Sequence, residues 1–304
     1  MAGFSPSDAA LEGFRLTRER PKALLAWTLF ALLISVAGAV ITINMPADGR
    51  AALQSLEADG AIDPGALMQA LLVLSPLLVF GLSVQCMMAA AVYRILLRPV
   101  GDRFSYLRFG GDELRLMGLT LIYLVLAVFL IAIVQLGVAL LGLLASIAGE
   151  AATTFVLAVA ELFSLGLLIF VGIRMSLAPV ITFDRGKLAV FESWAMTRGQ
   201  FWRLGGAYLL AVCCLVVLAV VTLVVFFCLS LAAMMATGGE VADLVAILRA
   251  REVTASSYAS PFMIAYVLIG SLFTAMYYAV LAAPGAFAYR ALKDPSTSPP
   301  ATAA

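Results

Sequence analysis

The sequence predicts an all-α membrane protein in which six transmembrane helices form three repeated hairpins. The first reason is the composition: 63% of the residues are hydrophobic and 12% are charged, whereas soluble domains have about 45–50% and about 25%. The second is that five uncharged runs exceed the roughly 20 residues needed to cross a bilayer core. The third is a recurring pair that ends three apolar stretches, an Arg followed five residues later by a Pro: Arg94 and Pro99, Arg174 and Pro179, Arg290 and Pro295. Such recurrence is typical of a repeated structural unit.

Charged residues bound each predicted span. One further run, 151–173, has the required length but contains a single acid, Glu161. Helices are expected rather than strands, because lipid cannot hydrogen-bond free backbone groups and the runs lack the alternation of apolar and polar residues that barrel strands show. In chain order, the uncharged runs cover 23–47, 64–93, 116–149, 204–239 and 253–289.

A short amphipathic helix is expected at the cytoplasmic membrane surface before each hairpin, and we call it an elbow helix. The first opens with Ser5 and Pro6, a helix cap followed by a Pro at the first helical position. A shift of 180 residues aligns its Glu12, Thr17 and Arg18 with identical residues in the third segment. Amphipathic helices of this kind place apolar side chains among lipid headgroups and basic ones toward water. The predicted elbow helices cover 5–19, 102–113 and 184–198.

The positive charges predict the orientation of the spans. Sixteen of the nineteen Lys and Arg residues fall in the N-terminal segment, the C-terminal tail and the two loops that share their side. The positive-inside rule therefore places both termini in the cytoplasm. We expect residues 1–295 to form a single transmembrane domain, followed by a disordered tail at 296–304, with hairpin repeats at about 1–99, 100–179 and 180–295.

A resemblance to a known family is concentrated in residues 170–210. The pattern resembles the integral membrane domain found beside glycerophosphodiester phosphodiesterases and in related stand-alone bacterial inner-membrane proteins. The resemblance implies a six-helix domain with cytoplasmic elbows in the bacterial inner membrane. It implies no catalytic residues, since in the fused proteins these belong to a separate soluble domain. The residues that carry it are Arg174, Leu177, Ala178, Pro179, Glu192-Ser193-Trp194, Thr197-Arg198-Gly199 and Phe201-Trp202-Arg203.

The composition excludes several classes of enzyme and of binding protein. The chain contains no His, which removes Ser-His-Asp triads and most zinc and transition-metal sites. Its four Cys residues lie inside apolar runs without metal-ligand spacing, and no nucleotide-binding loop is present. The net charge of +1 gives no support to nucleic-acid binding. We therefore expect no enzymatic activity, no cofactor and no metal.

Arginines at the cytoplasmic ends of the spans are the candidate ligands for lipid headgroups. Anionic headgroups attract such residues by about 1 kcal/mol each at the membrane surface. A guanidinium can also bind phosphate through two N–H groups at once. Topology alone explains the same cluster of positive charge without any specific binding. The candidates are Arg15, Arg18, Arg94, Arg174, Arg198, Arg203 and Arg290.

Two further features inside the spans are candidates for function. Glu161 and Gln135 stand thirteen residues on either side of Ala148, the predicted tip of a tight hairpin. Equal distances along antiparallel helices give equal depth, so we expect these side chains to meet and to face the bundle rather than lipid. Their contact would be either a structural hydrogen bond or part of a proton or cation relay. The hinge candidates are Pro76, Pro284 and Gly285, which fall within or near the end of predicted spans.

Two functions remain open from the sequence. The first is a non-catalytic polytopic membrane protein that binds lipids, anionic ones among them, or envelope partner proteins. The second is a small transporter or channel with its path between the hairpin repeats. The outer loops 46–64 and 239–258 are either docking sites for a partner or solvated connectors.

Overall fold

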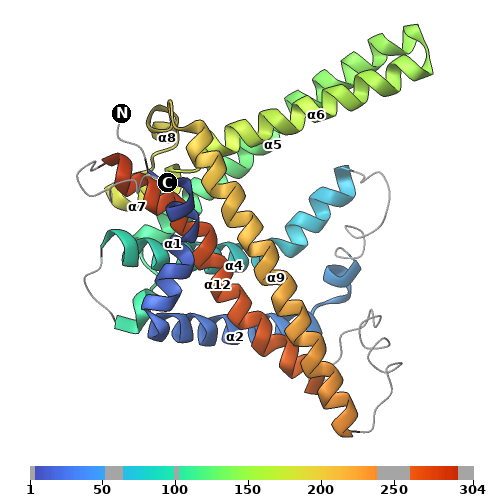
Figure 1. Cartoon of the computed structure of the whole chain (residues 1–304). Coiled ribbons are helices and arrows are strands. Elements are labelled where there is room, and N and C mark those ends of the chain that lie inside the picture. Colours follow the sequence, from blue (N-terminus) through green and yellow to red (C-terminus); the bar gives the residue numbers. More distant parts are fainter. Residues whose placement is uncertain (1–3, 52–63, 99–102, 238–260, 294–304) are drawn as a thin grey trace.

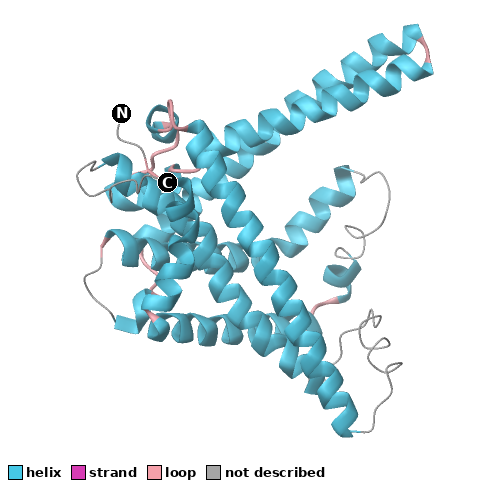
Figure 2. Cartoon of the chain, viewed as in Figure 1, coloured by secondary structure: helices cyan, strands magenta, loops and turns pink. Residues whose placement is uncertain are grey.

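The computed structural model describes residues 4–51, 64–98, 103–237 and 261–293. Within these ranges every regular element is a helix and no strand occurs (Figure 2). The predicted disordered tail, Pro99, Pro295, the whole loop 239–258 and most of the loop 46–64 lie outside the described residues.

Six helices are long and apolar enough to cross a membrane, which confirms the predicted class of protein. The acid Glu161 does not interrupt the fourth of them. A further helix, α1, precedes the spans, and two short helices, α7 and α8, connect the fourth to the fifth. The six long helices are α2 (Pro21–Ile43), α4 (Pro64–Leu97), α5 (Gly111–Ala145), α6 (Glu150–Met175), α9 (Phe201–Thr237) and α12 (Pro261–Lys293).

Helix α12 is the centre of the packing. Helices α1, α2, α4 and α9 all pack against it. Helices α5 and α6 form a hairpin that projects away from the other helices (Figure 1). Helices α9 and α12 also pack as a pair, whereas α2 and α4 each pack mainly on α12 rather than on one another in the described part of the chain. The three pairs of spans are therefore not packed equivalently.

Small residues on α12 explain how so many helices approach it. Ala275, Ala279 and Ala283 recur every four residues and are fully buried, so one face of α12 is flat. Trp27 of α2 and Met88 of α4 belong to the same buried cluster. Close packing of large side chains onto small ones is what holds helices together in lipid, where no hydrophobic effect acts between them.

Helix α1 (Pro6–Glu19) begins as the sequence predicts, but it lies in the helix bundle. The hydroxyl of Ser5 caps it by accepting a hydrogen bond of 3.4 Å from the backbone N–H of Asp8. Its buried face packs on α9 and α12. A Cβ atom at Gly13 would lie 2.5 Å from the Cα of Val280, so only Gly allows the two backbones to cross this closely.

The other two elbow predictions are wrong in their secondary structure. The described part of segment 102–113, residues 103–113, contains a 3-10 turn, η1 (Arg103–Tyr106), and then irregular chain before α5 begins at Gly111. Segment 184–198 is broken because Gly186 adopts a left-handed conformation with φ of 63° and ends α7 (Ala178–Arg185). Helix α8 (Glu192–Met196) is one turn long. Most of α7 is buried, so it is a core element rather than a surface helix.

The proline positions have structural explanations. Pro179 lies in the first turn of α7, where its missing N–H is not needed. Helices α4 and α12 continue through Pro76 and Pro284. Gly285 is buried, and a Cβ atom there would lie 2.8 Å from the hydroxyl of Tyr208. Gly285 therefore allows α12 to pack closely against Tyr208 of α9.

Candidate functional site

A buried ion pair occupies the junction of α4 and α5. Arg94 is 4% exposed and Glu113 is fully buried, and their side chains form a salt bridge. Arg94 also donates a hydrogen bond of 2.9 Å to the carbonyl of Tyr106. The other carboxylate oxygen of Glu113 accepts a hydrogen bond of 2.9 Å from the N–H of Gly110 and so caps α5. The prediction that Arg94 reaches lipid headgroups is therefore wrong, because its guanidinium is enclosed by protein partners.

The turn that receives Arg94 is held in an unusual backbone conformation. Ser105 and Tyr106 have positive φ angles of 52° and 68°, which cost about 1–2 kcal/mol per residue for side chains other than Gly. Three side chains hold the turn. Trp27 donates to the carbonyl of Ser105 at 3.0 Å, Arg20 donates to the hydroxyl of Tyr106 at 2.9 Å, and Arg94 binds the carbonyl of Tyr106.

Asp112 gathers guanidinium groups beside the buried pair. Its carboxylate is 16% exposed and lies 3.0 Å from Arg115, 3.8 Å from Arg98, 3.9 Å from Arg108 and 4.0 Å from Arg94. Arg98 also donates to two carbonyls in the last turn of α7, those of Phe183 and Asp184. This network joins α4, α5 and α7, so its primary role is structural.

A second ionic contact ties α12 to α7. The carboxylate of Asp184 accepts a hydrogen bond of 2.7 Å from the hydroxyl of Tyr289 and forms a salt bridge with Lys293. Together with the contacts of Arg98, this places α7 as the common anchor for the ends of α4 and α12.

Arg174 sits between two aromatic rings at the end of α6. Its guanidinium carbon lies 5.5 Å from the ring centre of Phe170 and 5.2 Å from that of Trp194. The remaining contacts are long, at 3.4 Å to the carbonyl of Trp194 and 3.5 Å to the hydroxyl of Thr197. Its Nε is buried without a hydrogen-bond partner among the described residues. Arg174 thus lies at the joint between α6 and α8 and is only partly available to a ligand.

Five arginines of the predicted set are exposed at the surface, and three of them lie apart from the cavity described below. Arg18 lies in the last turn of α1, and Arg198 and Arg203 flank the start of α9. Trp202, next to Arg203, is 86% exposed. Exposed Trp beside Arg is typical of the headgroup zone of a membrane.

Arg15 and Arg290 are the two predicted headgroup ligands that the fold brings together. Both line a cavity of about 230 Å³ between α1, the end of α4 and the end of α12. Arg15 pairs with Glu19 through a hydrogen bond of 2.8 Å. Arg290 is exposed, contacts the ring of Phe287 and has no ion pair within the described ranges. The other lining residues are Glu12, Leu16, Glu19, Arg20, Ile95 and Leu96.

Glu12 is the buried acid of this cavity. Only 9% of its surface is exposed. Burial raises the pKa of Glu12 above its ordinary value near 4.5, and the positive charges of Arg15 and Arg290 oppose this effect without cancelling it. The spacing of Ala9, Glu12 and Leu16 would have indicated this position, since it puts all three on the buried face of α1.

A larger hollow of about 510 Å³ adjoins the cavity and shares Glu19 and Arg20 with it. Lys22 and Tyr106 contribute to its wall. Across the two hollows, four basic side chains (Arg15, Arg20, Lys22 and Arg290) face two acidic ones (Glu12 and Glu19). The sequence did not single out Arg20 or Lys22, because their convergence with Arg290 depends on how α12 packs against α1 and α4. We call the two hollows together the basic groove.

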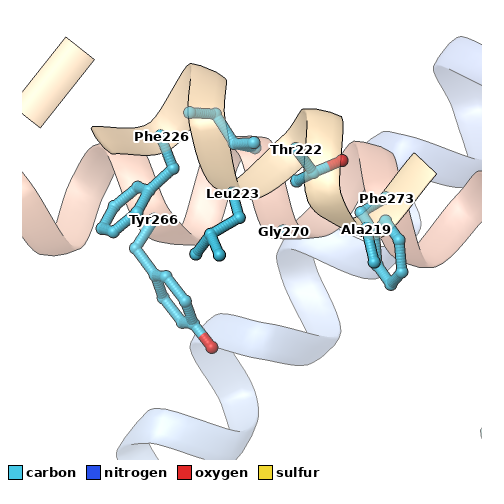
Figure 3. Close-up of a pocket in the computed structure, with 8 residues that line it drawn as sticks. Ala219, Thr222, Leu223, Phe226, Tyr266, Gly270 and Phe273 are labelled. Carbon is cyan, nitrogen blue, oxygen red and sulfur yellow. The ribbon is translucent and has the colours of Figure 1, made fainter. Parts of the chain in front are cut away.

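An apolar groove lies between α9 and α12. Its volume is about 190 Å³, and the side chains of Phe226 and Tyr266 stand at one end of it (Figure 3). The hydroxyl of Thr222 donates to the carbonyl of Leu218 in its own helix, so its hydrogen is already used. The groove is chemically suited to an acyl chain and to little else. Its lining is Ala219, Thr222, Leu223, Phe226, Tyr266, Ile269, Gly270 and Phe273.

Gln135 and Glu161 meet on the α5–α6 hairpin. The side-chain nitrogen of Gln135 lies 3.5 Å from a carboxylate oxygen of Glu161, as the equal spacing from the hairpin tip predicts. Both residues are exposed, because the hairpin projects from the other helices. The prediction that Glu161 faces the interior of a bundle is therefore wrong for a single chain. Gln135 is its one hydrogen-bond partner among the described residues, so no relay leads to or from it there.

The comparisons with known proteins give no match. No protein-family model fits this chain, and neither a curated protein nor a solved structure is detectably similar to it. In the described ranges no cluster of Cys, Asp and Glu could hold a metal ion. All four cysteines are free thiols.

Proposed function

We propose that this chain is a non-catalytic, multi-pass protein of the bacterial inner membrane, with both termini in the cytoplasm, that binds the headgroup of an anionic lipid in the basic groove. The observation that carries the proposal is the convergence of Arg15 and Arg20, at the end of α1, with Arg290 of α12 on one hollow. Convergence from distant parts of the chain is not needed for topology, which requires only that the charges lie on one side.

The free charge of Arg290 is the main source of affinity. Arg15 is partly neutralised by Glu19, whereas Arg290 makes no ion pair with a described residue. A guanidinium binds a phosphate through two parallel N–H groups, and such charge-assisted hydrogen bonds are about twice as strong as neutral ones. A lipid phosphate beside Arg290 would supply the salt-bridge partner that Arg290 lacks among the described residues.

The apolar surface next to the groove suits the rest of a lipid. Leu25 and Leu29 of α2 are 67% and 56% exposed, which is the chemistry that acyl chains contact. The carboxylate of Glu12 can accept a hydrogen bond from a glycerol hydroxyl or an ammonium group of a headgroup. The combination of basic and acidic groups therefore favours a headgroup that also carries a donor, such as phosphatidylglycerol.

A transport path between the hairpins is less well supported. The junction of α4, α5 and α7 is filled by the Arg94–Glu113 pair and its neighbours, and the cores beside it consist of buried apolar side chains. Lipid binding requires no opening of this region. We therefore prefer the lipid-binding function over the transporter.

Native mass spectrometry of the detergent-purified protein tests the proposal. Phosphatidylglycerol should remain bound at defined stoichiometry and should be retained at least tenfold less by Arg290→Gln, since losing a charged hydrogen-bond partner costs about 1.5–3 kcal/mol. Arg50→Gln is the matched control, because Arg50 is also exposed and lies far from the groove in the sequence. Equal retention by both variants would show that the groove does not bind the lipid.

A further inference from the structure

The α5–α6 hairpin presents a polar pair in the middle of a surface that no described residue of another helix covers. Gln135 and Glu161 are both exposed, and large apolar side chains surround them, including Val128 at 60% and Leu165 at 54% exposure. The hairpin meets the other described helices only near its base, through the neighbours of α5 and α6 there. No residue of the same chain in the described ranges covers the pair.

Leaving this pair in contact with lipid is unfavourable. Acidic residues at the centre of a membrane helix cost at least about 2.5 kcal/mol on insertion scales, and they almost always face protein or a water-filled cavity. Glu161 lies in the middle of α6, with eleven residues before it and fourteen after it in that helix. Because the described part of the chain leaves the pair uncovered, this cost favours a partner from another molecule.

The unused hydrogen-bonding groups of Gln135 and Glu161 complement those of the same two residues in a second copy of the chain. The amide of Gln135 carries two N–H donors, of which one is used by Glu161, and the carboxylate of Glu161 keeps a second oxygen free. A twofold axis beside the pair would let each Gln135 donate its second N–H to the Glu161 of the other chain. The four groups would then satisfy one another without any residue of a different kind, which is the self-complementarity that a symmetric dimer requires.

Small residues next to the pair allow the close approach that such bonds need. Ala132 and Ala139 flank Gln135 one turn away on α5, and Ala158 stands one turn before Glu161 on α6. All three are exposed. Membrane helices approach most closely where small residues lie at the interface.

We propose that the exposed face of the α5–α6 hairpin around Gln135 and Glu161 is the interface of a symmetric dimer of this chain. The two hairpins pack side by side in the membrane, and reciprocal hydrogen bonds join Gln135 of each copy to Glu161 of the other. The interface does not depend on lipid binding, since no residue of α5 or α6 lines the basic groove.

Single-molecule photobleaching of the full chain in liposomes tests the dimer. Wild-type protein labelled at one site should show two bleaching steps at a protein density where Gln135→Leu/Glu161→Leu shows mainly one. Two reciprocal membrane hydrogen bonds of average strength correspond to about a sevenfold change in the dimer dissociation constant. Phe163→Leu is the control. Phe163 is 73% exposed and lines a separate apolar groove between α5 and α6, on a face of α6 other than that of Glu161. Its replacement should therefore leave the dimer intact.

Disulfide trapping locates the interface without relying on the dissociation constant of the dimer. In a background without Cys86, Cys213, Cys214 and Cys228, Ala158→Cys should cross-link two copies in membranes, whereas Phe163→Cys should not. A wild-type protein that stays monomeric at every density tested, a double Leu variant that dimerises as well as wild type, or cross-linking at Phe163 alone would overturn the proposal.

Discussion

The buried Arg94–Glu113 pair gives the sharpest prediction about stability. Replacing Glu113 by Leu removes the carboxylate that pairs with Arg94 and leaves a guanidinium that is 4% exposed without its counter-ion. Breaking a buried pair in this way typically costs about 3–5 kcal/mol. The N–H of Gly110 also loses its acceptor, which adds about 1 kcal/mol. Because folded domains are stable by only about 5–15 kcal/mol, the variant should lose a large fraction of its stability.

Unfolding by SDS titration in mixed micelles measures this loss. The double variant Arg94→Met/Glu113→Leu should recover most of the lost stability, because it removes both charges and replaces them with apolar groups of similar size. Glu19→Gln is the control: it breaks the exposed Arg15–Glu19 pair and should leave the unfolding midpoint unchanged. Stability of Glu113→Leu within about 1 kcal/mol of wild type would show that the pair is not buried as described.

Three further predictions concern the packing of α1 and α12. Gly13→Ala should destabilise the protein by about 1–3 kcal/mol in the same assay, because the new methyl group meets the backbone of Val280. Gly38→Ala is the control and should have no effect, because the space around Gly38 is open. The raised pKa of Glu12 means that the folded state favours the protonated carboxyl. The contribution of protonated Glu12 to the free energy of unfolding should therefore be full below about pH 4.5 and should be lost as the pH rises through the raised pKa. Glu12→Gln should abolish this pH dependence. Asp184→Asn should lower stability by about 1.5–3 kcal/mol through its lost charged hydrogen bonds, as measured by thermal unfolding in detergent.

The parts of the structure that the sequence predicts are those governed by local rules. Span length, helix type and the start of α1 follow from apolar runs and from the cap at Ser5. The contact between Gln135 and Glu161 follows from counting along one hairpin, where both partners are close in sequence. Each of these depends on neighbours within about 30 residues.

The environments of the three repeated arginines could not be predicted, because they depend on distant partners. Arg94 is buried against Glu113, Arg174 is stacked between two rings, and Arg290 is exposed beside a cavity. The same Arg and Pro spacing therefore leads to three different contacts. The signal for the first was present in part, since Glu113 stands three residues after Gly110 at a helix start, where an acid caps the helix. Nothing in the spacing shows that Arg94 shares this acid.

The packing of α1 inside the bundle could not be predicted from its composition either. Its charged residues indicate a surface helix, but Gly13 and the small residues Ala9 and Ala10 form a face that packs tightly in the bundle. The same packing brings Glu12, Arg15 and Arg290 together. A helix that looks interfacial from its charges therefore builds one wall of the basic groove.

The most direct test of lipid binding is a cryo-EM reconstruction of the protein in nanodiscs that contain phosphatidylglycerol. Headgroup density should fill the basic groove, with the phosphate within hydrogen-bonding distance of Arg290 and Arg15, and this density should disappear in the Arg290→Gln variant. A groove that contains only solvent, with ordered lipid elsewhere on the protein, would contradict the proposed function.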